Sequence, residues 1–90
     1  MKFKSISTLI KTLRKEKKLS QMQLSHLIGY KNGQFISNVE RGKCALPDTK
    51  IAILADTLSC TPDLIIDAML TDRKYYLQQV VKTCTILDVS

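Results

Sequence analysis

The sequence has no tryptophan, only three glycines and two prolines, and no apolar run long enough to cross a membrane. So few glycines and prolines exclude a collagen-like or low-complexity chain, and 44% hydrophobic against 24% charged residues is typical of a protein that folds. A chain of 90 residues builds about one small domain, which excludes an enzyme with a cleft between two lobes. Residues 1–5 lead into a charged amphipathic stretch instead of an apolar leader, so we expect a cytoplasmic protein without a membrane partner.

Residues that bind metals or carry out catalysis are also scarce. The single histidine, His26, has no partner at a metal-ligand spacing, and Cys44, Cys60 and Cys84 are too far apart for a zinc site or a disulfide framework. The chain has no glycine-rich phosphate loop and no nucleophile with a base and an orienting residue. We therefore predict no enzyme activity, no cofactor, no metal and reduced cysteines.

Cys44 has cationic neighbours in the sequence. It follows Lys43 directly and lies three residues after Arg41. Positive charge of this kind lowers the pKa of a thiol and makes it reactive. Redox sensing by Cys44 is therefore one hypothesis, beside a purely structural role.

Positive charge is concentrated in one half of the chain. Fourteen Lys and Arg against eight Asp and Glu give a net charge of +6. Residues 1–45 carry ten basic and two acidic side chains, whereas residues 46–90 carry four basic and six acidic ones. This asymmetry favours a polyanionic partner, either a nucleic acid or an anionic membrane surface. Charge alone is equally compatible with a solvated face that keeps the protein soluble.

Two amphipathic helices are predicted in the cationic half. The first covers residues 5–17, with Arg14 off the apolar face, and that face consists of Ile6, Leu9, Ile10 and Leu13. Ser20 and Gln23 form a Ser-x-x-Gln capping box, which predicts the start of a second helix. This helix is expected to end at Gly29, with Leu24, Leu27 and Ile28 facing the core.

A third, short helix is predicted over residues 33–41. Asn32 is its expected N-cap and Gly42 its expected C′ residue. Its apolar side consists of Phe35, Ile36 and Val39, and its other side of Gly33, Gln34, Ser37 and Asn38. An ordinary solvated helix face would carry more Glu and Lys, so this small, amide-bearing face is a candidate binding surface.

Three further helices are predicted in the second half. Pro47 and Asp48 start a fourth helix, whose apolar face is Ile51, Leu54, Ala55 and Leu58. Thr61 and Pro62 start a fifth, whose buried residues are expected to be Leu64, Ile65, Ala68 and Met69. Thr71 and Asp72 are predicted to cap a sixth. Residues 83–89 are rich in β-branched side chains and are compatible with either a short strand or a frayed tail.

A capped helix, a turn at Gly29 and a short helix with an amide-rich face make up a helix-turn-helix arrangement, whose second helix enters the DNA major groove. Two stretches are characteristic: Leu19-Ser20-Gln21-Met22-Gln23-Leu24 with Ile28-Gly29, and Ile36-Ser37-Asn38-Val39-Glu40-Arg41-Gly42-Lys43. They resemble the Cro and phage-repressor type of helix-turn-helix, also called the xenobiotic-response-element family. The resemblance implies an all-α, lambda-repressor-like domain of five helices over residues 1–70, and residues 71–90 follow as a C-terminal helical appendage.

The resemblance also implies which residues contact DNA bases. The turn of residues 30–33 is one residue longer than the commonest turn in the family, so we count positions back from Glu40. On that count Gln34, Ser37 and Asn38 fall on base-contacting positions. Gln and Asn amides suit this role because each presents a donor and an acceptor together and can bond adenine bidentately.

Further roles follow from the same resemblance. Gln21 falls at the start of the second helix, where family members contact phosphate and where the helix dipole favours an anion. The predicted phosphate contacts are Gln21, Lys31, Asn32 and Lys43. Arg14 and Glu40 match a pair that bridges the first helix to the end of the third in related repressors, so we expect a structural ion pair.

We expect a transcriptional regulator that binds double-stranded DNA as a homodimer, because one recognition helix covers only a few base pairs. The expected role is repression at an approximately palindromic operator, and no small-molecule effector is evident. The candidate dimer interface lies in the appendage and comprises Tyr75, Tyr76, Leu77, Val80, Val81, Ile86, Leu87 and Val89. These residues could equally fold back on their own core. The alternative function is a protein-interaction module, such as an antitoxin or adaptor with the same fold.

Overall fold

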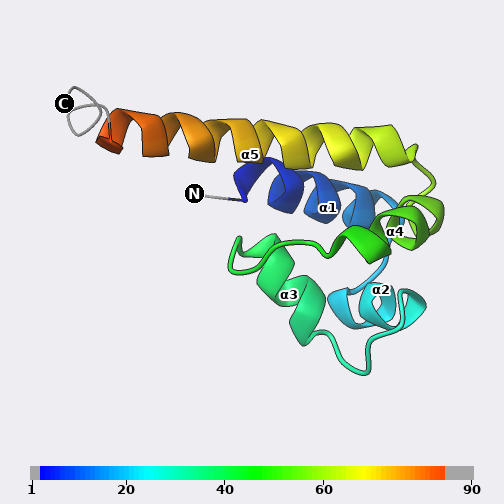
Figure 1. Ribbon diagram of the computed structural model, residues 1–90. Coiled ribbons are helices and arrows are strands. Elements are labelled where there is room, and N and C mark those ends of the chain that lie inside the picture. The colour runs from blue at the N-terminus through cyan, green and yellow to red at the C-terminus, as the bar shows by residue number, and fades with distance from the viewer. Residues whose placement is uncertain (1–2, 85–90) are drawn as a thin grey trace.

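The computed structural model describes residues 3–84, which form five α-helices and one 3₁₀ turn and contain no strand. The elements are α1 (Lys4–Glu16), α2 (Gln21–Leu27), α3 (Gln34–Glu40), η1 (Asp48–Lys50), α4 (Ile51–Thr57) and α5 (Pro62–Cys84). In Figure 1 the long α5 lies along α1 on one side of the molecule, and α2 and α3 lie on the opposite side. The predicted all-α class is confirmed.

All five α-helices contribute to one buried core. Its members are Ile6, Ile10, Leu24, Ile28, Ile36, Val39, Leu46, Leu54, Ala55, Leu58 and Ile65. Each large aliphatic side chain buried in this way stabilises the fold by roughly 1.5–3 kcal/mol. Because α2 and α3 share this core with α1, α4 and α5, the rest of the domain holds the two helices of the candidate site in place.

The buried face of α1 differs from the predicted one. Ile6 and Ile10 are buried, but Leu9 and Leu13 are only half-buried. Arg14, expected off the apolar face, is buried instead. The face is rotated toward Arg14 because this side chain has partners inside the fold, among them Glu40.

Two leucines that were expected to face the core are exposed. Leu27 on α2 is 54% exposed and Leu64 on α5 is 42% exposed. Successive residues of a helix point about 100° apart, so a buried side that is set by other residues turns Leu27 and Leu64 toward solvent. Ser25 completes the buried face of α2 beside Leu24, and the buried residue at the start of α5 is Ile65. The prediction was therefore wrong at Leu27 and Leu64.

The predicted sixth helix is also wrong, because α5 runs from Pro62 to Cys84 without a break. Thr71 Oγ1 donates to the carbonyl of Asp67 within α5, so it caps no new helix. The carboxylate of Asp72 instead accepts hydrogen bonds from the backbone N–H groups of Ser5 (2.8 Å) and Ile6 (3.0 Å). Asp72 thus caps α1 from a distant part of the chain.

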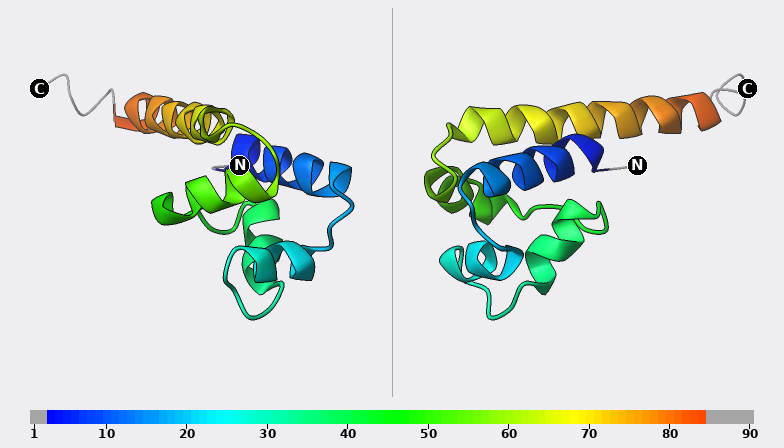
Figure 2. Two further views of the ribbon diagram at one scale, coloured as in Figure 1. Left: turned by 90° about the vertical axis from the view of Figure 1, so that its right-hand side faces the viewer. Right: turned by 180° about the vertical axis from the view of Figure 1, so that it is seen from behind.

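The C-terminal end of the chain is described only in part. Residues 71–84 form the second half of α5, which includes Thr83 and Cys84 of the predicted strand or tail. The rest of that segment, with Ile86, Leu87 and Val89, lies outside the described residues. Figure 2 shows that the second half of α5 extends beyond the N-terminal end of α1.

Candidate nucleic-acid interface

The capping box at the start of α2 is formed as predicted. Ser20 Oγ accepts a hydrogen bond from the N–H of Gln23 (3.0 Å), and Gln23 Oε1 accepts one from the N–H of Ser20 (2.8 Å). At the other end of α2, Gly29 has a φ of +98°, in the left-handed region that favours glycine. Local sequence signals therefore define both ends of α2.

The turn between α2 and α3 is held by contacts that the sequence did not indicate. The rings of Tyr30 and Phe35 stack with their centroids 4.1 Å apart. Lys50 lies over the Tyr30 ring at 5.0 Å, and its Nζ donates to the carbonyl of Ile28 (2.9 Å). Lys50 thereby satisfies a carbonyl at the C-terminal end of α2. Its partners are distant in the sequence, which is why the pattern gave no signal.

The start of α3 lies very close to the start of α2. Gly33 precedes α3 directly, and a Cβ atom at this position would be 3.2 Å from both Cα and N of Met22. The prediction of Asn32 as the N-cap was wrong by one residue, because α3 starts at Gln34 and its N-cap is Gly33. Asn32 Oδ1 still accepts a hydrogen bond from the N–H of Gln34 (2.9 Å). The missing side chain at Gly33 lets the two helices approach.

Replacing Gly33 with alanine should therefore destabilise the domain. The φ of Gly33 is −78°, so the alanine backbone is unstrained, but its Cβ meets backbone atoms that cannot rotate away. We expect the free energy of unfolding, measured by urea denaturation, to fall by about 1–2 kcal/mol. An unchanged free energy would show that α2 and α3 separate slightly at no cost.

The exposed side of α3 carries two paired amides. Gln34 Nε2 donates to Asn38 Oδ1 at 2.9 Å, one helical turn away. Gln34 is exposed, and Ser37 and Asn38 are half-buried. The bond leaves the oxygen and one N–H of the Gln34 amide free in this pair, as well as the NH₂ group of Asn38. The structure therefore brings together the two amides that were predicted to contact bases.

Arg14 and Glu40 form the expected ion pair. Arg14 Nε is 2.6 Å from Glu40 Oε2, and Arg14 Nη2 donates to Glu40 Oε1 at 3.0 Å. A third guanidinium nitrogen, Nη1, donates to the carbonyl of Leu19 at 2.8 Å. This bidentate arrangement ties α1 both to the end of α3 and to the chain just before α2.

Gln21 joins the same network. Its Nε2 donates to Glu40 Oε1 at 3.1 Å, so part of the amide is used inside the protein. The half-buried side chain bridges the first residue of α2 to the last residue of α3. The sequence did not indicate this contact. The predicted contact of Gln21 with phosphate stays a prediction.

The two lysines that were predicted to contact phosphate flank α3. Lys31 lies in the turn before α3, Lys43 follows its C-terminal end, and both side chains are exposed. The carbonyl of Lys31 is 2.8 Å from His26 Nε2, which fixes the backbone of the turn. A positive charge therefore stands at each end of the exposed α3 face.

The environment of Cys44 does not favour redox sensing. Burial raises the pKa of the Cys44 thiol, and burial does the same at Cys60. This is the opposite of the lowering expected from Lys43 and Arg41. A raised pKa reduces the fraction of reactive thiolate at neutral pH. The environment of Cys44 favours the structural role.

Residues 3–84 contain neither a membrane-spanning helix nor a metal-binding cluster. No helix in this range has the length and apolar character of a membrane span. No three His, Cys, Asp or Glu side chains in this range are grouped so that they could hold a metal ion.

Comparisons with known proteins agree with the geometry. A helix-turn-helix family model of the Cro/C1 type matches residues 10–65, which include every residue of the candidate site. The crystal structure of the clp gene regulator ClgR from Corynebacterium glutamicum has a similar fold, with a TM-score of 0.65 at 14% identity over 99% of this chain and 95% of that chain. No curated protein sequence gives a significant match. Because the family model spans more than half of the chain, the protein belongs to the Cro/C1-type helix-turn-helix family of DNA-binding transcriptional regulators.

Proposed function

We propose that α3 reads a specific DNA sequence through Gln34, Ser37 and Asn38. The observation that carries this proposal is the exposed amide pair of Gln34 and Asn38, joined at 2.9 Å on the outer face of α3. Two amides held side by side present donors and acceptors that are complementary to the N7 acceptor and the N6 donor of an adenine edge in the major groove. The close approach at Gly33 and the ion pair of Arg14 with Glu40 fix α3 so that this face keeps its position.

Phosphate contacts complete the proposed interface. Lys31 and Lys43 are exposed on either side of α3 and would neutralise backbone phosphates, which adds salt-dependent affinity without sequence preference. Asn32 uses its amide oxygen for the N–H of Gln34, and Gln21 uses one N–H of its amide for Glu40. The remaining amide N–H groups of both residues can donate to phosphate. These four residues are proposed to orient the protein on the duplex.

Selection from a random duplex library tests the proposal. We expect a two-fold motif with half-sites about 34–36 Å apart. Gln34→Ala and Asn38→Ala should each lose about 1–3 kcal/mol of discrimination at one base position of the half-site. Affinities of the wild type and both variants, measured for the selected site and for single-base changes in it, give this quantity.

Gln79→Ala is the matched control, because Gln79 is an exposed amide on α5, which lies on the side of the molecule opposite α3 (Figure 1). Its discrimination should equal that of the wild type. A DNA-binding protein typically binds its specific site at least about 10³-fold more tightly than non-specific DNA. If the wild type shows only weak, sequence-independent and salt-sensitive binding, the base-reading proposal fails, and a protein-interaction role takes its place.

We further propose that the protein binds DNA as a homodimer and represses transcription by occupying a promoter. The second half of α5 supports this, because it exposes Leu77, Val80 and Val81 on one side of the helix. Apolar side chains grouped on one projecting helix are typical of a surface that is covered in an assembly. A two-fold pair of subunits would present two α3 helices to one operator.

A charge placed in this surface should weaken the dimer. Leu77→Glu inserts a carboxylate where the proposed interface is apolar, so sedimentation equilibrium should show a dissociation constant raised by at least about tenfold. Gln78→Glu adds the same charge at the next residue without removing an apolar side chain, and should change the constant much less. If Leu77→Glu dimerises like the wild type, this part of α5 is not the interface.

A further inference from the structure

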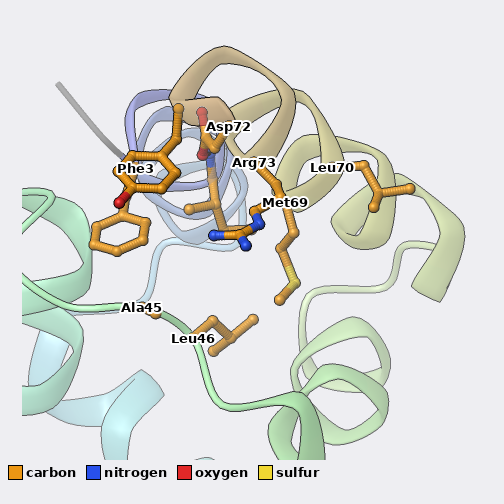
Figure 3. A pocket seen from close by; sticks show the side chains of 9 residues that line it. Phe3, Ala45, Leu46, Met69, Leu70, Asp72 and Arg73 are labelled. Atoms are coloured by element: carbon orange, nitrogen blue, oxygen red, sulfur yellow. Dashed lines mark hydrogen bonds between the residues drawn. The ribbon is translucent and has the colours of Figure 1, made fainter. Parts of the chain in front are cut away.

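A cavity of about 410 Å³ lies beneath α5, away from the exposed face of α3. Figure 3 shows it between α5 and the segment of Ala45 and Leu46, which joins α3 to η1. Phe3, at the start of α1, and Met69 on α5 line other parts of its wall. This volume is within the range of roughly 300–1,000 Å³ that is usual for small-molecule sites. The lining is largely apolar, which suits an apolar ligand body.

Arg73 is the one basic residue among the described residues that line this cavity. The guanidinium of Arg73 points from α5 toward Ala45 and Leu46 in Figure 3, and it lies 5.4 Å from the centre of the Tyr76 ring. Among residues 3–84 no carboxylate lies within ion-pair distance of Arg73. The nearby carboxylate of Asp72 has both oxygens bonded to the N–H groups of Ser5 and Ile6. Arg73 therefore keeps its donors available for an anion.

We propose that this cavity binds a small molecule with an apolar body and a single anionic group, such as a medium-chain carboxylate. The apolar body would pack against Met69, Leu46 and Phe3, and the carboxylate would pair with the planar fork of Arg73. Burial of the ligand's apolar body supplies affinity, and the Arg73 guanidinium favours ligands that carry a negative charge. The site shares no residue with the proposed base and phosphate contacts, so it stands independently of how the protein reads DNA.

Decanoate is a suitable probe. It is titrated into the ¹⁵N-labelled full chain, and backbone N–H shifts are followed by NMR without DNA. We expect saturable shifts centred on Ala45, Leu46 and Met69, which surround the cavity. Shifts that do not saturate, or that lie elsewhere, overturn the proposal. Octan-1-ol, which has an apolar chain without a charge, serves as the second probe.

Two variants and a control separate charge from volume. Arg73→Gln should weaken decanoate roughly tenfold or more and leave octan-1-ol unchanged, because only the charge-assisted bonds are lost. Ala45→Phe, at an exposed position on the wall, should weaken both probes by filling the space. Lys74→Gln removes the neighbouring cation, which does not line this cavity, and should change the affinity for neither decanoate nor octan-1-ol. Equal decanoate affinity in Arg73→Gln and wild type would overturn the proposal.

A second copy of the chain is the competing occupant. In that case the Ala45 and Met69 signals shift when the ligand-free protein is diluted, and decanoate binds more weakly at high protein concentration because a second copy covers the cavity. The cavity would then belong to an interface between subunits. That result would also overturn the small-molecule proposal. Circular dichroism of each variant checks that the helices are intact, so that lost binding is not confused with lost folding.

Discussion

Arg14→Ala is expected to lower the free energy of unfolding by about 3–5 kcal/mol, as is usual when one partner of a buried ion pair is removed. The Glu40 side chain is only 3% exposed, so the variant leaves a carboxylate buried without its cation. The carbonyl of Leu19 also loses its donor. Since small domains are stable by only about 5–15 kcal/mol, the variant should lose a large share of its stability.

Urea denaturation of three variants tests this expectation. Lys15→Ala removes an exposed cation from the next position of α1 and should change stability by less than about 0.5 kcal/mol. The double variant Arg14→Ala, Glu40→Ala should recover part of the loss, because no buried charge is left unpaired. Equal losses in Arg14→Ala and Lys15→Ala would refute a structural role for the ion pair.

The parts of the fold that could be predicted from sequence are those fixed by neighbouring residues. The capping box of Ser20 and Gln23 spans only one helical turn, so its hydrogen bonds can be inferred from residue type and spacing. Gly29 and Gly42 both have positive φ, as expected at the ends of α2 and α3. Local signals of this kind placed the helix-turn-helix correctly.

The errors arose where a partner lies far along the chain. Leu27 and Leu64 fit an apolar pattern, but the neighbours that decide which side of a helix is buried come from other elements. Lys50 reaches Ile28, from which it is 22 residues distant in the sequence. Thr71 and Asp72 looked like a helix cap, and Asp72 is one, but for α1 instead of its own helix. The residue type of Asp72 indicated a helix cap, but the sequence did not indicate which helix it caps.

The candidate site divides in the same way. The pairing of Arg14 with Glu40 came from the resemblance, since nothing in their spacing of 26 residues indicates contact. That Gln34 and Asn38 share one face follows from helical periodicity, because they are four residues apart. The cavity beside Arg73 had no sequence signal, because its walls come from α1, α5 and the segment after α3. Only tertiary packing defines such a space.

Asp72→Ala is expected to lower the free energy of unfolding by about 2–4 kcal/mol, which is more than an exposed N-cap contributes. Asp72 is only 6% exposed, and its carboxylate accepts hydrogen bonds from the N–H groups of both Ser5 and Ile6. Removing it leaves these donors at the start of α1 without partners and loses the favourable interaction of a negative charge with the helix dipole. The contact also joins α5 to α1, so hydrogen exchange should increase at the first turn of α1.

Two further variants show whether the double acceptor is what matters. Asp72→Asn keeps one oxygen but turns an NH₂ group toward a backbone N–H, so its loss should approach that of Asp72→Ala. Asp67→Ala removes an exposed carboxylate from the same helix and should change stability by less than about 0.5 kcal/mol. If Asp72→Asn is as stable as the wild type, one hydrogen bond is sufficient to cap α1. The charge of Asp72 would then contribute little, and the link between α5 and α1 would depend on the apolar contacts around Ile6 and Ile65.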